Sequence, residues 1–177
     1  MRRGSAASDP RLEQWRKDWA AACAAPSGDG AEALRARLGE LGAEDDDRYE
    51  IEREMLEGLE AVVELSAVVS ANGLRPIVTG HRAVGSDRCY FTAPVSLPDD
   101  PAQAAGTLLL TEARAIVVGG SRSLTLPWHS VARCLQQDRD LVLVRASRED
   151  LHRLRCNSFA DVLRAAYLVR EVTNRRL

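Results

Sequence analysis

The segment spanning residues 106–133 constrains the fold more than any other part of this chain. It contains three short apolar runs separated by turn residues, and a proline and a tryptophan then lead into a fourth run, GTLLLTEARAIVVGGSRSLTLPWHSVAR. Short runs of this composition, bounded by glycine, serine and proline, are typical of antiparallel β-strands. The segment therefore predicts a small β-sandwich or barrel, and it contains few side chains that indicate chemistry.

The β-pattern extends from residue 74 to residue 156. Turn signals such as Gly119-Gly120 separate the runs, and the proline-rich stretch over residues 97–101 is interpreted as a loop. Many short strands at this spacing predict an antiparallel sandwich or a partly open barrel. The predicted strands span residues 77–84, 88–95, 107–111, 115–118, 123–126, 131–136, 141–145 and 151–156.

Residues 1–72 have the patterns of helices instead. Asp9 and Pro10 form an N-terminal capping pair for the first helix, and Gly42 lies where the second would end. Aspartates at the start of the third helix suit the positive end of a helix dipole. The predicted helices span residues 10–24, about 31–42 and 45–72. We therefore divide the chain into a helical arm, residues 1–72, and a domain, residues 73–177.

The third helix contains a heptad-like apolar seam. Its members recur at spacings of four and three residues, and Gly58 interrupts the helix at a cost of about 1 kcal/mol relative to alanine. Such a seam suits packing on the first two helices, or a homodimer through the helix over residues 46–71. The seam consists of Met55, Leu59, Val62, Ser66 and Val69.

Charge divides the 177-residue chain into two unlike parts. Residues 1–70 have nine basic and sixteen acidic side chains, a net charge of −7, whereas residues 71–177 have a net charge of +5. Opposite charges and the apolar seam predict that the arm docks on the domain. An arm docked in this way could mask a basic face until a partner displaces it, or it could be a permanent helical layer.

A last helix completes the pattern. Asn157 or Ser158 caps it, and its apolar residues fall on one face that must be buried. Seven or eight strands followed by one helix, together with Gly106-Thr107-Leu108-Leu109-Leu110-Thr111-Glu112-Ala113-Arg114 and Leu126-Pro127-Trp128-His129-Ser130-Val131, resemble the pleckstrin-homology-like (PH-like) domains, in particular GRAM and bacterial PH-like domains, over residues 75–173. This resemblance implies an α+β fold, an antiparallel sandwich or partly open barrel closed by a C-terminal helix. It also implies lipid or protein binding, and rarely catalysis.

The resemblance also indicates where an anion would bind. Phosphoinositide-binding members have several lysines and arginines on the first hairpin, which bind phosphates through charge-assisted hydrogen bonds. The corresponding positions here are His81, Arg82 and Arg88, with no lysine among them. We therefore expect weak attraction to anionic membranes, without specific recognition of a headgroup.

Metal and covalent chemistry have little support in the sequence. His152 and Cys156 fall on one face of a predicted strand, but a zinc site needs about four ligands. The other candidates, His81, Cys89, His129 and Cys134, lie scattered without paired spacing. Motifs of nucleophilic catalysis and of phosphate-binding loops are absent, and so is the aromatic basic strand of RNA-binding proteins. We expect no metal, no cofactor, no nucleic acid and no enzymatic activity.

These observations predict a cytoplasmic, non-enzymatic interaction or regulatory module that binds a protein partner. The four cysteines lack CxxC spacing and no signal peptide precedes them, so we expect them to be reduced. The alternative function is a peripheral membrane module that binds anionic lipid through arginines of the first hairpin.

Overall fold

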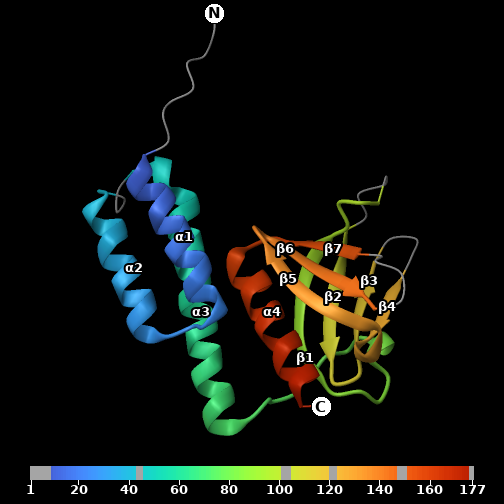
Figure 1. The fold of residues 1–177 in the computed structure, drawn as a ribbon. Helices are drawn as coiled ribbons and strands as arrows, with labels where there is room; N and C mark the ends of the chain where they lie inside the picture. Colours follow the sequence, from blue (N-terminus) through green and yellow to red (C-terminus); the bar gives the residue numbers. More distant parts are fainter. Residues whose placement is uncertain (1–8, 43–45, 101–104, 120–122, 147–150, 176–177) are drawn as a thin grey trace, which may run out of the picture.

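The computed structural model describes residues 9–42, 46–100, 105–119, 123–146 and 151–175, and it confirms the α+β class (Figure 1). Three N-terminal helices precede an antiparallel sheet of seven strands, and a C-terminal helix follows it. The helices are α1 (Pro10–Ala24), α2 (Gly28–Glu40), α3 (Glu50–Asn72) and α4 (Phe159–Asn174), with 3₁₀ turns η1 (Asp47–Tyr49), η2 (Arg82–Val84) and η3 (Trp128–Ser130). The strands are β1 (Cys89–Ser96), β2 (Ala105–Thr111), β3 (Arg114–Val118), β4 (Leu124–Pro127), β5 (Val131–Gln137), β6 (Asp140–Arg145) and β7 (Leu151–Cys156).

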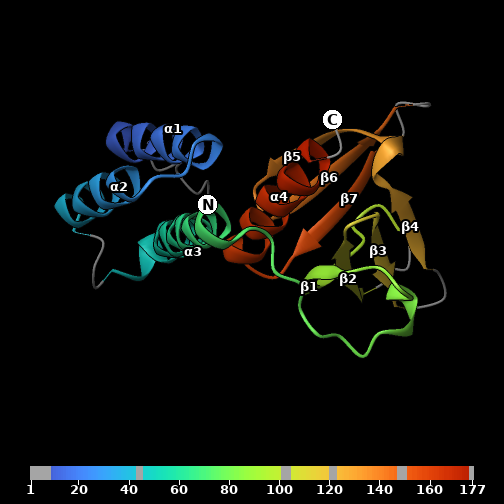
Figure 2. The ribbon, with the colours of Figure 1, turned by 90° about the horizontal axis from the view of Figure 1, so that it is seen from below.

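The sheet has the strand order β4-β3-β2-β1-β7-β6-β5. Only two residue pairs, Val95 with Cys156 and Ser96 with Arg155, join β1 to β7. The sheet therefore divides into a four-stranded part and a three-stranded part, which lie at an angle to each other (Figure 2). Among the described residues β4 and β5 do not pair, so the sheet stays open and has two edges.

The hairpin of β2 and β3 is stabilised by Thr111, whose side chain is fully buried. Its hydroxyl accepts hydrogen bonds from the backbone N–H groups of Ala113 (3.2 Å) and Arg114 (3.0 Å). The indole Nε1 of Trp128 donates to the Thr111 carbonyl at 2.9 Å. A hydroxyl residue that bonds the backbone of the turn explains how the motif Thr-Glu-Ala-Arg closes the hairpin.

The prediction of a strand over residues 77–84 is wrong. This segment is a loop that ends in η2, and Ile77 and Val78, which are adjacent in sequence, are both exposed. Val84 packs with Cys89, Leu109 and Ile116 in a small second core, and the Ile77 N–H donates to the Cys89 carbonyl at 2.7 Å. A strand would direct alternate side chains to one buried face, and the loop has no such face.

Helix α4 occupies the open side of the sheet. It packs against β1, β2, β5, β6 and β7, and its N-cap Ser158 accepts from the backbone N–H of Asp161 at 3.1 Å. The apolar face places Phe159, Val162 and Leu163 in the main core. Burial of this face confirms the predicted closing helix.

The helical arm is a small bundle with its own polar and apolar contacts. The indoles of Trp15 and Trp19 are buried and donate to the carbonyls of Leu34 (2.8 Å) and Met55 (2.7 Å), which ties α1 to α2 and α3. Helix α2 begins three residues earlier than expected because Ser27 caps it. Helix α3 begins later than expected, at Glu50, because η1 precedes it.

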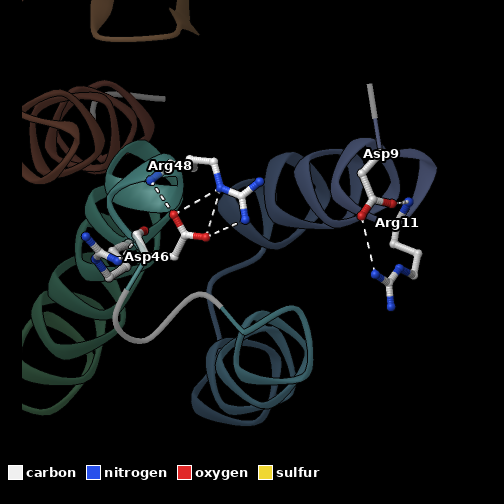
Figure 3. A network of polar contacts seen from close by, with 5 residues as sticks. Asp9, Arg11, Asp46 and Arg48 are labelled. Carbon is white, nitrogen blue, oxygen red and sulfur yellow. Dashed lines mark hydrogen bonds and ion pairs between the residues drawn. The ribbon is translucent and has the colours of Figure 1, made fainter. Parts of the chain in front are cut away.

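Two aspartates cap N-terminal turns in the arm (Figure 3). Asp9 accepts from the backbone N–H of Arg11 and Asp46 from that of Arg48, each at 2.9 Å. These hydrogen bonds, together with those from the two arginine side chains, lower the pKa of both carboxyl groups. The charged carboxylates therefore stabilise the starts of α1 and η1.

The arm and the domain share one core. Met55, Leu59, Val62 and Val69 of the seam are buried within the chain, and α3 packs on α4 as well as on α1 and α2. The sequence did not predict the contact with α4. The contact between α3 and α4 explains why residue 58 is glycine, because a Cβ there would lie 2.9 Å from the backbone of Phe159. Gly58 lies within the continuous helix α3 and leaves room there for the start of α4.

A polar contact reinforces this packing. Glu54 of α3 accepts from the backbone N–H of Phe159 at 3.1 Å and forms an ion pair with Arg139 in the β5–β6 turn. Trp19 lies edge-on to the Phe159 ring, with centroids 5.6 Å apart. The predicted docking of the arm on the domain therefore occurs in the described structure.

In the described part of the chain, no helix combines the length and apolar character needed to cross a bilayer.

Candidate functional site

Strand β5 presents an open edge of seven residues. A two-residue loop joins it to β6, with Asp138 at φ 50°, a conformation that aspartate tolerates. Such a loop is closed by a hydrogen-bonded residue pair, here Gln137 with Asp140. Along an antiparallel ladder, hydrogen-bonded pairs then alternate with pairs that do not bond each other. The main-chain N–H and C=O groups of Cys134 and Gln136 therefore point away from β6, towards the free edge.

The other end of the ladder gives the same alternation. The N–H of Ala146 donates to the Ser130 carbonyl at 2.9 Å, which makes this pair a bonded one. A bulge between Val131 and Arg133 then shifts the register by one residue. From Arg133 onward the alternation matches that set by the turn.

A groove of about 590 Å³ runs beside this edge. One wall is formed by η3 and the first residues of β5, and the other by the C-terminal half of α4, including Val169 and Thr173. The buried Trp128 is one of its lining residues and is held by its hydrogen bond to Thr111. The groove thus combines a fixed aromatic side chain with an open strand edge.

The electrostatics of the groove favour negative charge. Arg133 of β5, Arg170 of α4 and His129 line it, and its described lining residues include no carboxylate. Arg170 also donates to the carbonyl of Ala24 at 3.3 Å, so its guanidinium is held in place. Arg133 is exposed and forms no ion pair with a described residue.

The cysteine beside the edge is not a reactive thiol. Burial raises the pKa of Cys134 to about 12, and likewise those of Cys23 and Cys156. These sulfur atoms are protonated near neutral pH, and the thiol is a much weaker nucleophile than the thiolate.

The predicted anion-binding residues do not lie on a hairpin. His81 precedes η2, Arg82 belongs to it, and Arg88 immediately precedes β1, so all three lie on the loop before the first strand. All three are exposed, and so are Ile77 and Val78. The loop therefore presents basic and apolar side chains together.

The metal candidates lie apart in the fold. His152 and Cys156 are on β7, Cys89 begins β1, and Cys134 is on β5. Among the residues that the structure describes, no three His, Cys, Asp or Glu side chains gather in a way that could hold a metal ion.

Sequence reasoning found β5 and α4 but missed the groove between them. The strand and the helix are separated by two further strands, and nothing in their own patterns says that they become neighbours. A usable signal was the composition of β5, which combines arginine and glutamine with few large apolar residues, as expected of a strand that is not covered on both sides. Comparison of the sequence with models of protein families and with curated proteins gives no match.

Proposed function

We propose that this chain is a non-enzymatic interaction module that binds an extended segment of a protein partner along β5. The supporting observation is the free edge of β5 beside a groove of about 590 Å³. A segment that adds to an exposed strand gains main-chain hydrogen bonds, and the neighbouring groove accepts its alternate side chains. The implied resemblance to PH-like domains, which bind proteins or lipids, agrees with this proposal and stays a prediction.

The partner segment carries acidic side chains. Arg133 and Arg170 line the groove without a carboxylate among its described residues, and an acidic side chain near them gains charge-assisted hydrogen bonds. The same charges disfavour a second copy of this chain as the occupant. In a symmetric β5–β5 pair the arginines of both copies would face one groove, and like charges opposite each other destabilise strand pairing.

Two proline substitutions test the proposal. Gln136→Pro removes an N–H that faces the free edge and leaves the bonded pairs of β5 and β6 intact. The matched control is Thr125→Pro on β4. The N–H of Trp128 donates to the Ala113 carbonyl at 3.1 Å, and alternation from this bonded pair directs Thr125 to the outer side of β4. Both variants therefore change an outward position on an edge strand.

The probes are linear nine-residue peptides selected on the wild-type protein from a random phage-displayed library, then synthesised and measured by fluorescence anisotropy. We expect enrichment of acidic, alternating sequences, a loss of affinity of tenfold or more in Gln136→Pro, and unchanged affinity in Thr125→Pro. Circular dichroism checks that both variants fold. Selection of no peptide, or equal binding by all three proteins, would refute binding along β5.

A second candidate function rests on the loop before β1. Val78 is fully exposed and lies near Arg75, His81 and Arg82 in sequence, a combination suited to the surface of an anionic membrane. Co-sedimentation with phosphatidylserine vesicles tests it. Loss of binding in Val78→Asp and in the double variant Arg82→Ala, Arg88→Ala would support a lipid-binding role, and absence of binding by the wild-type protein would exclude it.

A further inference from the structure

The distal half of the β5 edge faces the helical arm. Beyond the main groove, a smaller cavity of about 200 Å³ lies between β5, α4 and α1. Cys134, Leu135 and Gln136 line it from β5, and Ala20 and Ala24 are among the α1 residues on the other side. Arg170 and Cys134 line both cavities, so the two adjoin and together form a path along the strand.

The face of α1 beside the smaller cavity consists of small residues. Ala20, Cys23 and Ala24 recur at spacings of three and four and therefore share one face of the helix. Strands in a sheet are about 4.8 Å apart, so an added strand needs space next to β5 that large side chains on α1 would fill. The sequence of α1 keeps that space open.

Helix α1 is fixed in this position. Trp15 and Trp19 are buried and hydrogen-bonded to α2 and α3, and Arg170 of α4 donates to the carbonyl of Ala24. A third cavity, of about 450 Å³, lies beside Ala20 and Gln136 and reaches Asp138 in the β5–β6 turn, and here Arg16 and Trp19 of α1 also line it. Cavities therefore separate α1 from β5 beside Cys134, Leu135 and Gln136.

We infer that the arm is part of the binding site, with α1 forming the wall opposite β5, so that an extended acidic segment lies between β5, α4 and α1. This inference rests on the proposed function and assigns a binding role to the arm. Residues Arg133–Gln137 provide five regularly paired positions beside the path, which is about 17 Å at ~3.4 Å per residue. A nine-residue peptide is long enough to reach α1, whereas a four-residue peptide need not do so.

Substitutions on α1 test this role. Ala20→Trp fills the path between α1 and β5. Ala21→Trp is the matched control, because Ala21 is exposed and is not among the residues that line either cavity. The probes are a selected nine-residue peptide and its four-residue half that protects the outward-facing Cys134 amide, but not the Gln136 amide, from hydrogen exchange. In Ala20→Trp we expect tenfold or greater weakening for the long peptide and less than twofold change for the short one. Ala21→Trp should change neither.

The results separate this inference from the proposed function. Loss of long-peptide binding in Gln136→Pro, with unchanged binding in Ala20→Trp, would leave binding along β5 in place and refute the role of α1. Tighter binding in Ala20→Trp would also refute it, because the arm would then be a lid that the substitution displaces. Failure of the wild-type protein to bind any selected peptide would refute the proposed function itself. Thermal unfolding of each variant confirms that the fold is kept.

Discussion

The two edges of the sheet differ in length, composition and surroundings. Strand β4 has four residues. Alternation directs the main chain of Thr125 and Pro127 outward, and Pro127 has no N–H. Thr125 therefore provides the one outward N–H of this strand. Strand β5 has seven residues and no proline, and it directs the main chain of both Cys134 and Gln136 outward. Helix α4 packs beside β5, and among the described residues it has no comparable contact with β4.

This difference teaches how an open sheet can be specific about where it pairs. Short edge strands and proline prevent unwanted strand addition, whereas a long regular edge invites it. Here one edge is protected by its own sequence. The other is left open and lies beside a groove lined by arginines.

Hydrogen exchange gives the largest expected difference along β5. The amides of Cys134 and Gln136 face the free edge, whereas that of Leu135 bonds to Val142 in β6. We expect exchange at Leu135 to be slower by about a hundredfold or more, since bonded amides exchange only through local or global opening. Residue-resolved exchange by NMR measures this. Slow exchange at Cys134 and Gln136 with fast exchange at Leu135 would reverse the assigned alternation.

Substitution of Gly58 disturbs α4, which packs more extensively on β5 than on β4. A Cβ at this position would lie 2.9 Å from the backbone of Phe159, at the start of α4. We expect Gly58→Ala to lower the free energy of unfolding by about 1–2 kcal/mol, because overpacking outweighs the gain in helix propensity.

Gly28→Ala is the matched control, since a Cβ there meets no atom within 4 Å. Urea unfolding compares the two variants. Equal stabilities would mean that α3 and α4 approach less closely than described. If Gly58→Ala changed amide hydrogen exchange equally in β4 and in β5, the two edges would not be independently supported.

Removal of the Glu54 charge has a smaller effect. This carboxylate accepts from the Phe159 N–H and pairs with Arg139 next to the end of β5. Both side chains are partly exposed, so solvent screens the pair, and we expect Glu54→Gln to cost about 1 kcal/mol. A double-mutant cycle with Arg139→Ala isolates the pair, and additive effects would show that it contributes nothing.

The smallest expected effect on the free energy of unfolding at neutral pH comes from the Cys134 thiol on β5. Strand β4 has no titratable side chain and gives no such effect. Burial raises the pKa of Cys134 from 9.0 to about 12. Between these values the unfolded chain has lost a proton that the folded chain keeps, so the free energy of unfolding falls as pH rises. Unfolding in urea at pH 8 and pH 10 measures this fall. Cys134→Ser should reduce it, and an unchanged slope would place the buried thiol elsewhere.

Local patterns were enough to predict most elements. The helix over residues 10–24 and the strand over residues 151–156 match the structure, because capping residues and alternation mark their ends. The strand over residues 77–84 was wrong because β-type composition does not guarantee a buried face. Ile77 and Val78 show this, since both remain exposed.

The candidate site was less predictable than the fold. His81, Arg82 and Arg88 were chosen by analogy with a first hairpin, which this chain does not form at that place. The groove beside β5 needs the strand order, which places β5 at an edge, and the path of α4, which brings Arg170 near Arg133. These are pairings between residues far apart in the chain.

The sequence by itself determined the α+β class, the closing helix and the presence of a helical arm, because periodicity and capping act within a few residues. The tertiary structure alone decided which strand edges stay open, why α3 needs Gly58, and where α1 lies relative to β5. The physical reason is that pairing and packing depend on surfaces that become neighbours only after folding. Gln136 and Thr125 are both polar residues on edge strands, and their different surroundings arise from long-range contacts.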